Sequence, residues 1–180
     1  MAHDESLYFI AIIPDQDLSD RISCLKEEAY ELFNTKAALK SPPHITLHMP
    51  FRWRTDKEPE LISTLEQFNF SNYPLAVEVS NYGYFPPRVV FLKIVHNNEL
   101  IALQKALFRF IKSNLKIYNA NYKERPFHPH MTIAFRDLKK RDFIAAQAHF
   151  NSKKFQATFQ VNNICLLRHD GQRWQPHRFF

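Results

Sequence analysis

Glycine is almost missing from this sequence, since Gly83 and Gly171 are the only two among 180 residues. Loops that cradle phosphates or dinucleotides with backbone N–H groups need several glycines at fixed spacing. The composition therefore excludes phosphate binding of the P-loop or dinucleotide-binding kind, and we expect no cofactor. A phosphate bound by this protein would be held largely by side chains.

Signals for export or membrane insertion are missing as well. Cys24 and Cys165 are the only cysteines, too few for a disulfide framework or a four-cysteine zinc site. The apolar run over residues 7–13 is short, ends at Pro14 and follows no basic segment. We therefore expect reduced thiols, a cytoplasmic location, and neither a signal peptide nor a membrane span.

Apolar and aromatic residues, in contrast, are plentiful. Hydrophobic residues make up 45% of the chain and aromatic residues 14%, with 17 phenylalanines. This is enough to bury one sizeable core, so we expect residues 1–180 to form a single domain, of two lobes, and a monomer. The net charge of +6 and the pI of about 9.3 favour anionic partners, nucleic acid among them.

Hydrophobic periodicity predicts a chain of mixed strands and helices. One strand-helix-strand unit ends at His44 and a later one ends at His130, which suggests two pseudo-equivalent lobes around a cleft. Asp15, Asn97 or Asn98, and Asp137 are candidate helix caps. The predicted strands cover residues 7–13, 44–51, 75–82, 88–95, 130–135, 155–161, 164–168 and 173–179, and the predicted helices cover residues 15–32, 58–68, 97–111 and 137–150.

Two H-x-T triplets carry the most specific chemistry. Each follows a proline and opens a predicted strand: His44-Ile45-Thr46 and His130-Met131-Thr132. In a strand, side chains at i and i+2 share a face, so each motif presents an imidazole and a hydroxyl together. A single H-x-T triplet is short and common by chance, whereas two in equivalent positions favour a shared function.

Paired imidazoles and hydroxyls suit bond breaking at phosphorus. A neutral imidazole removes a proton from the attacking hydroxyl or water, and an imidazolium protonates the leaving oxygen, because histidine titrates near neutrality. The threonine hydroxyls would donate to the non-bridging phosphate oxygens. The scheme requires no metal, and the histidines show no closely spaced ligand set for zinc: His48, four residues after His44, would lie about 13 Å away along a strand.

The motifs resemble those of the two-histidine phosphoesterase superfamily, in its bacterial 2′-5′ RNA ligase-like (LigT-like) branch. The resemblance rests on residues 43–47 with Phe51, on residues 125–134, and on the apolar opening over residues 8–14. It implies a bilobed α+β fold, with an antiparallel sheet in each lobe and both motifs facing a central groove. It also implies that His44 acts as general acid and His130 as base, with Thr46 and Thr132 binding phosphate.

One departure concerns an arginine that many relatives carry directly after the position of Ala134. Here Phe135 intervenes and Arg136 follows. In a strand, a shift of one residue turns the arginine side chain to the opposite face. We therefore expect Arg136 to point away from the groove.

Several other side chains are weaker candidates for substrate binding. Phe51 and Tyr84 would either stack on a base or pack in the core, and Arg88 and Arg125 would either bind phosphate or remain solvated. His128 shares a strand face with His130, and we expect it to line the cleft without a catalytic role.

The motifs predict a metal-independent phosphoesterase, and the resemblance implies that it hydrolyses 2′,3′-cyclic phosphodiesters at RNA ends or in cyclic nucleotides. The same four motif residues would also serve a 2′-5′ RNA ligase or a 2′-5′ phosphodiesterase. An alternative of another class is a non-catalytic RNA-binding module that keeps the groove. The expected partner in each case is RNA or a nucleotide, in the first case one with a cyclic phosphate, and no membrane.

Overall fold

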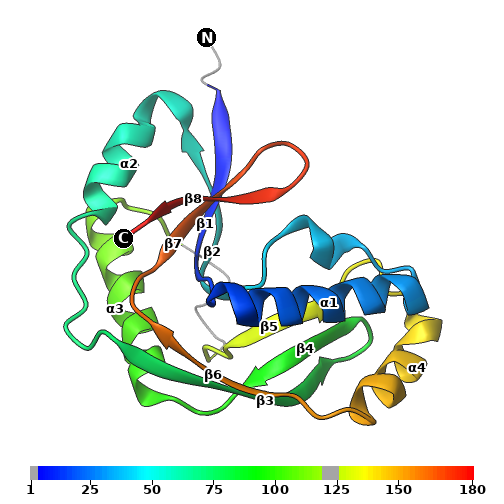
Figure 1. Ribbon diagram of the computed structural model, residues 1–180. Coiled ribbons are helices and arrows are strands. Elements are labelled where there is room, and N and C mark those ends of the chain that lie inside the picture. The colour runs from blue at the N-terminus through cyan, green and yellow to red at the C-terminus, as the bar shows by residue number, and fades with distance from the viewer. Residues whose placement is uncertain (1–3, 119–125) are drawn as a thin grey trace.

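The computed structural model describes residues 4–118 and 126–180, which form two four-stranded antiparallel sheets flanked by helices (Figure 1). The strands are β1 (Glu5–Ile12), β2 (Ile45–Arg54), β3 (Leu75–Phe85), β4 (Val89–Ile94), β5 (His130–Ala134), β6 (Gln156–Val161), β7 (Cys165–His169) and β8 (Trp174–Phe179). The helices are α1 (Gln16–Phe33), α2 (Glu58–Leu65), α3 (Asn98–Asn114) and α4 (Lys140–Asn151), with 3₁₀ turns η1 (Ala37–Lys40) and η2 (Thr55–Lys57).

The order of the strands places both histidine motifs at sheet edges. One sheet has the order β2-β1-β7-β8 and the other the order β5-β4-β3-β6, with antiparallel pairing throughout. Thus β2 and β5, which carry the two motifs, are edge strands, and they contact each other. The prediction of an α+β fold with an antiparallel sheet in each half is confirmed.

The helices join the two sheets. Helix α1 follows β1 but contacts β5 of the other sheet, and α3 follows β4 but contacts β2 as well as β3. The buried apolar cluster accordingly takes residues from both sheets, such as Ile10 and Leu47 from one and Val77 and Met131 from the other. None of the helices in residues 4–118 and 126–180 has the length and apolar character needed to cross a bilayer.

Helix α1 begins and ends where the sequence predicts. The Asp15 side chain accepts a hydrogen bond from the backbone N–H of Leu18 at 2.9 Å, which caps the first turn. Ile22 and Ala29 are buried on the core-facing side, and Asn34 ends the helix in the left-handed conformation with φ 50°. The local pattern therefore predicted both ends of this helix.

The start of α4 was predicted wrongly. The helix begins at Lys140, and its N-cap position is Lys139 rather than Asp137. The Asp137 carboxylate instead accepts hydrogen bonds from Thr35 and from the backbone of residues 36–37. A long-range partner thus replaces the local capping role that the sequence suggested.

Irregular pairing between β1 and β2 controls which side chains of β2 reach the groove. The register pairs Ala11 with Thr46 and Ile10 with His48, so an extra residue of β2 interrupts the alternation after Thr46. His48 consequently lies in the core, 1% exposed, with its ring against Phe51 and Phe108.

Candidate functional site

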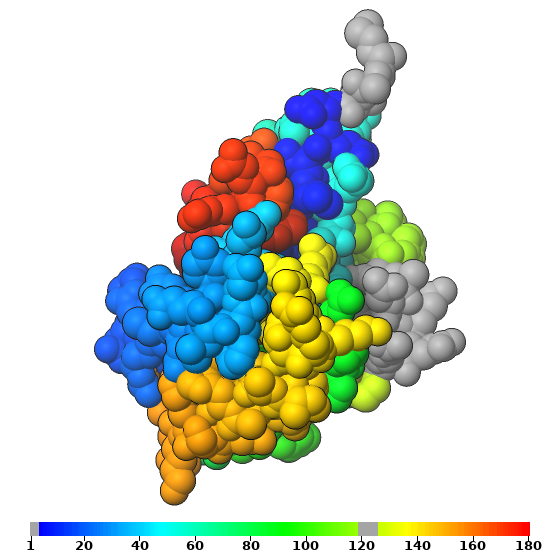
Figure 2. Space-filling view, turned by 90° about the vertical axis from the view of Figure 1, so that its right-hand side faces the viewer, coloured from blue at the N-terminus to red at the C-terminus, as the bar shows by residue number. Residues whose placement is uncertain are grey.

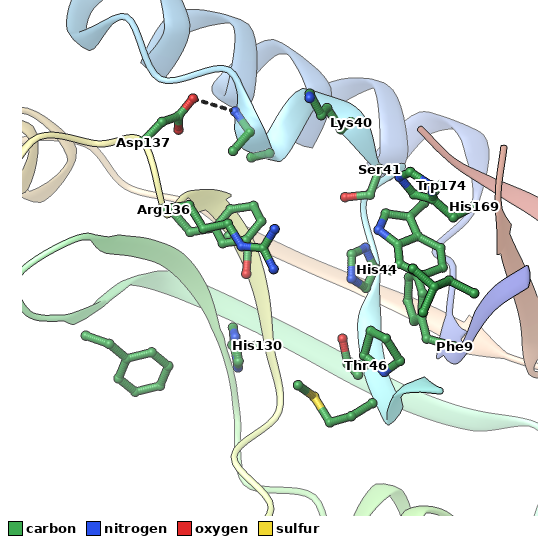
Figure 3. A pocket seen from close by; sticks show the side chains of 18 of the residues that line it. Phe9, Lys40, Ser41, His44, Thr46, His130, Arg136, Asp137, His169 and Trp174 are labelled. Carbon is green, nitrogen blue, oxygen red and sulfur yellow. Dashed lines mark hydrogen bonds between the residues drawn. The ribbon is translucent and has the colours of Figure 1, made fainter. Parts of the chain in front are cut away.

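A groove of about 1370 Å³ lies between the two sheet edges. Both histidines and both threonines of the H-x-T motifs line it. In the close-up view, His44, directly before β2, and Thr46 on β2 face His130 on β5 across a common space (Figure 3). The fold therefore brings together all four residues that the two motifs predict.

His44 and His130 are oriented by the same backbone device. Nδ1 of His44 lies 2.7 Å from the carbonyl oxygen of Pro42, and Nδ1 of His130 lies 2.8 Å from that of His128. Because a carbonyl oxygen only accepts, Nδ1 carries the proton in both rings. In each neutral ring Nε2 is then the basic nitrogen and is left for a ligand in the groove.

The electrostatic surroundings of the two imidazoles differ. Burial lowers the pKa of His44 to about 4, the Pro42 carbonyl opposes this, and the positive charges of Lys26 and His130 lower the pKa further. Burial also lowers the pKa of His130. The backbone carbonyl of His128 raises this pKa, whereas the charge of the His128 side chain lowers it further. Both rings are therefore neutral at pH 7 in this structure, and His44 has especially low proton affinity.

Lys26 supplies a buried positive charge behind the His44 motif. It projects from α1, is 3% exposed, and donates from Nζ to the carbonyl oxygens of Ala38 at 3.2 Å and Ser41 at 3.0 Å. Burial lowers the pKa of its ammonium group to about 8. Lys26 thus anchors the segment that runs from η1 to His44.

Asp137 holds the other end of the same segment. Its carboxylate accepts hydrogen bonds from Thr35 Oγ1 at 2.7 Å and from the backbone N–H groups of Lys36 at 2.9 Å and Ala37 at 3.0 Å. The η1 turn and the segment after Ala134 consequently lie side by side at the surface (Figure 2). We call these contacts of Asp137 and Lys26 the clasp. The Asp137 contacts connect the segment that follows β5 with the segment that precedes β2, and the Lys26 contacts connect that same segment with α1.

Arg136 points into the groove, contrary to the expectation from the sequence (Figure 3). Strand β5 ends at Ala134, so the alternation of faces does not continue. Arg136 adopts φ 58°, and its guanidinium lies 5.2 Å from the centre of the Phe135 ring. Arg88, a predicted phosphate ligand, donates from Nη1 to the carbonyl oxygen of Arg136 at 3.0 Å and so supports the backbone of this turn.

The remaining predicted residues separate into two groups. His128 lines the groove as expected, with its ring 6.3 Å from that of His130. Phe51 is 9% exposed and stacks on Tyr8, and Tyr84 donates through its hydroxyl to Asn151, so both residues pack away from the groove. Arg125 lies outside the described residues.

The sequence did not indicate the aromatic side chains beside each catalytic candidate. The Phe9 ring lies 4.9 Å from that of His44 and 4.7 Å from that of Trp174. The rings of Phe85 and Phe91 lie 5.3 Å and 5.0 Å from that of His130. Phe9 belongs to a strand that reads as core, and no local signal relates Trp174 or Phe85 to the motifs.

Gly83 makes one of these aromatic contacts possible. It faces Phe91 across the β3–β4 ladder, and a Cβ at this position would lie 2.4 Å from the Phe91 ring. A larger residue would therefore displace the ring that packs against His130. One of only two glycines in the chain is used at this close approach.

The groove has a positive lining. Lys36, Lys40 and Arg136 border it. The carboxylate of Asp137 also lines the groove, but it accepts the hydrogen bonds of the clasp. Among residues 4–118 and 126–180, the histidine, cysteine and carboxylate side chains form no cluster of three or more that could hold a metal ion. The lining is suited to a phosphate anion.

Two antiparallel sheets whose edge strands each present a histidine and a threonine to one groove define the class of two-histidine phosphoesterases. A family model described as the 2′-5′ RNA ligase superfamily matches residues 14–173. The chain belongs to this superfamily.

Sequence and fold comparisons with known proteins support this assignment. A Geobacillus sp. protein described as a candidate phosphoesterase is 26% identical over 177 residues, covering 96% of this chain and 94% of the relative. A Bacillus pumilus protein with a similar description is 26% identical over 129 residues, covering 71% of this chain and 68% of the relative. Escherichia coli LigT complexed with 3′-AMP has the same fold, with a TM-score of 0.70, 20% identity and 98% coverage of both chains.

Proposed function

We propose that this protein is a metal-independent phosphoesterase that opens 2′,3′-cyclic phosphodiesters at RNA ends or in cyclic nucleotides. The observation that carries the proposal is the matched orientation of His44 and His130. Each ring is fixed through Nδ1 to a backbone carbonyl oxygen, and both rings border the same groove. In the proposed reaction, the two Nε2 atoms act on either side of one phosphorus atom.

In the proposed reaction, one imidazole takes a proton from water as its oxygen attacks phosphorus, and the other imidazole, in its protonated form, gives a proton to the departing ribose oxygen. The P–O bond to the ring oxygen breaks as the bond to the water oxygen forms. Thr46, Thr132 and Arg136 line the groove, and in the proposed reaction they stabilise the non-bridging oxygens. Both protons move through side chains, so the scheme needs no metal.

The resemblance assigns the acid role to His44, whereas the low pKa of His44 suits the base role. A phosphate anion in the groove would raise the pKa of both imidazoles, because an opposite charge favours their protonated forms. The assignment is therefore decided by pH–rate profiles of the two single variants measured on the same substrate.

The test is turnover of 2′,3′-cyclic nucleotides by His44→Ala and His130→Ala. Each variant should lose about 10²- to 10⁴-fold in kcat/KM, the usual contribution of general acid or base catalysis. His96→Ala is the matched control, because His96 is exposed and contacts Asn98 at the start of α3. Wild-type turnover should survive EDTA. Retained turnover in either folded motif variant would refute the proposal.

The non-catalytic alternative makes a different prediction. A protein of that kind would turn over no phosphodiester but would bind RNA with an affinity that falls steeply as salt rises. The positive groove lining supports RNA binding in either case. Turnover that depends on both histidines would exclude the alternative.

A further inference from the structure

The pairing of β2 with β1 is irregular on both sides of His48. One extra residue of β2 follows Thr46. A second lies between His48 and Phe51, because their partners on β1, residues 10 and 8, are one position closer together. Each extra residue forms a β-bulge, in which two residues of one strand lie opposite one residue of the other. Since β2 is an edge strand whose single ladder is interrupted here, its path beyond Thr46 depends on side-chain contacts.

The two bulges decide which side chains of β2 line the groove. In a regular strand every second residue shares a face, so residues 44, 46, 48 and 50 would all face the groove. Instead, His48 is 1% exposed in the core, and Met49 lines the groove in its place. Thr46 is the last residue before this change of alternation. A movement of the bulges would therefore change the backbone next to Thr46.

Side-chain contacts hold His48 on the core side. Its Nδ1 lies 3.0 Å from the carbonyl oxygen of Met49, and because a carbonyl oxygen only accepts, Nδ1 carries the proton. The imidazole packs against the ring of Phe108 on α3, with 6.3 Å between the ring centres. From the same helix, Nε2 of the buried Gln104 donates to the carbonyl oxygen of Leu47 at 3.5 Å. Helix α3 thus contacts both residues that follow the motif.

This position of His48 is unfavourable for stability. Burial lowers the pKa of His48, although the Met49 carbonyl opposes the shift, so the ring is neutral and Nε2 carries no proton. Nε2 is buried and has no hydrogen-bond partner within residues 4–118 and 126–180. A buried polar atom without a partner destabilises a fold, and an apolar side chain of similar size would avoid this. The imidazole therefore favours a role other than packing.

The second motif supports this interpretation. Thr132 is also followed by one extra residue, so that Ala134 occupies the position that corresponds to His48. An apolar residue can thus fill this buried position. Just beyond it, the Arg88 guanidinium donates to the carbonyl oxygen of Arg136 at 3.0 Å. After each motif, a side-chain donor binds a backbone carbonyl oxygen beyond the bulge, and in the first motif this donor is the imidazole.

We propose that His48 is a positioning residue, which holds the double bulge of β2 and thereby directs the Thr46 hydroxyl into the groove. It acts through its hydrogen bond to the Met49 carbonyl and its contact with α3. The inference rests on the proposed function, in which Thr46 stabilises a non-bridging oxygen of the substrate. It adds a residue that is remote from the phosphate but sets the geometry of a group that binds it.

The first test compares three substitutions of His48. His48→Leu removes both ring nitrogens, so the melting temperature should not fall. Its kcat on 2′,3′-cyclic nucleotides should fall by between about tenfold and about 10²-fold, the cost of misplacing a group by about 1 Å. His48→Asn, with an amide N–H near the position of Nδ1–H, should recover most of this loss although its smaller side chain lowers the melting temperature. His48→Gln, with its amide near the position of Nε2, should have a kcat as low as that of His48→Leu.

Tyr73→Phe is the matched control, because the Tyr73 hydroxyl is also buried without a hydrogen-bond partner among the described residues. Tyr73 packs against Phe70 in the segment between α2 and β3. Tyr73→Phe should keep the wild-type kcat, and its melting temperature should hold or rise. If kcat follows the melting temperature across the three His48 variants, His48 has a structural role alone and the proposal is overturned.

A double-variant cycle tests whether His48 acts through Thr46. If it does, Thr46→Val combined with His48→Leu should be no slower than Thr46→Val alone, because the hydroxyl that His48 positions is already missing. Losses that multiply in the double variant would overturn the proposal.

A measurement without substrate separates this inference from the proposed function. Methionine methyl groups labelled with ¹³C report on Met49 in the groove and on Met131 in the core. His48→Leu should shift the Met49 signal and leave the Met131 signal in place, whereas His48→Asn should restore the Met49 signal. An unchanged Met49 signal would overturn the inference even if cyclic nucleotides are turned over normally. A shifted signal in a protein that turns over no phosphodiester would support the inference and refute the proposed function.

Discussion

The two histidine motifs are alike in local geometry but differ in what surrounds them. Each histidine donates from Nδ1 to the carbonyl oxygen two residues earlier, each lies at the edge of its sheet, and each is followed by a threonine in the groove. Around His44 lie Lys26, Phe9 and the clasped η1 segment, whereas His130 has His128 and the exposed Phe85 beside it.

The orientation of the two imidazoles and their proton affinity therefore have different structural causes. The backbone hydrogen bond sets the direction of Nε2 in both rings, and it is the same in both motifs. In the proposed reaction the two nitrogens therefore act on one phosphorus in equivalent orientations. Burial and neighbouring positive charge set the proton affinity, and Lys26 lowers the pKa of His44 but is not a cause of the shift at His130. A repeated motif can therefore supply two chemically different groups without any change in its own sequence.

Among the variants outside the two histidines, we expect the largest effect from the motif threonines, which are alike in the two motifs. Thr46→Val and Thr132→Val keep the shape of the side chain but remove its hydroxyl. If both threonines stabilise the non-bridging oxygens, each variant should lower kcat by about 10²- to 10³-fold, as loss of one oxyanion donor does. Steady-state kinetics on 2′,3′-cyclic nucleotides measure this loss.

The matched control for the threonine variants is Thr158→Val, since Thr158 is exposed on β6. Similar losses in both motif variants would show that the two motifs contribute equally to phosphate binding. A loss in one variant only would show that the two threonines differ in function although the two histidines are oriented alike. A loss in neither variant would contradict the role assigned to the hydroxyls.

The next effect concerns the clasp, which joins the two motifs. Asp137→Asn leaves one acceptor oxygen for three donors, Thr35 Oγ1 and the N–H groups of Lys36 and Ala37. The η1 segment should then shift, and with it the position of His44 relative to His130. We expect kcat to fall by between about tenfold and about 10²-fold, because a displacement of about 1 Å can cost that much, with a smaller change in KM.

Asp142→Asn serves as the control for the clasp, because Asp142 is a nearby carboxylate paired with Arg141 in the first turn of α4. A fall in the melting temperature of Asp137→Asn without any fall in kcat would show that the clasp stabilises the fold but does not position His44.

The sequence predicted the elements of the molecule better than the relations between them. Strand alternation places Thr46 beside His44 and Thr132 beside His130, and helical periodicity with the Asp15 cap defines α1. These features depend on residues a few positions apart, so the sequence pattern determines them. The order of the motifs and their resemblance to a known family then predicted a shared groove.

What escaped prediction depends on contacts between distant segments. Asp137 was predicted to cap α4 and instead binds residues 35–37, about 100 positions away. Trp174 reaches Phe9 only because β7 pairs with β1, and Arg136 returns to the groove because β5 ends early and the backbone adopts a positive φ. Local preference does not specify any of these three outcomes.

The smallest effect that we expect concerns the charge of Lys26, which acts on His44 but not on His130. Lys26→Met removes the buried ammonium group while it keeps most of the apolar length of the side chain. The positive charge lowers the pKa of His44, so its removal should raise that pKa, although burial remains the largest cause and should keep it below the ordinary value of about 6.5. Titration of the imidazole Hε1 signals by NMR measures the change, and the pKa of His130 should stay nearly constant.

The same variant changes how stability depends on pH. The folded-state pKa of His44 lies below its unfolded value, so the native protein favours the neutral ring. The stability that this group provides is complete above pH about 6.5 and is lost as the pH falls toward about 4. With a higher folded-state pKa, Lys26→Met should lose less stability between pH 7.5 and pH 5 than the wild type, as measured by urea unfolding. Lys105→Met, an exposed substitution on α3, controls for the loss of a lysine. An unchanged His44 pKa in Lys26→Met would mean that burial alone distinguishes His44 from His130.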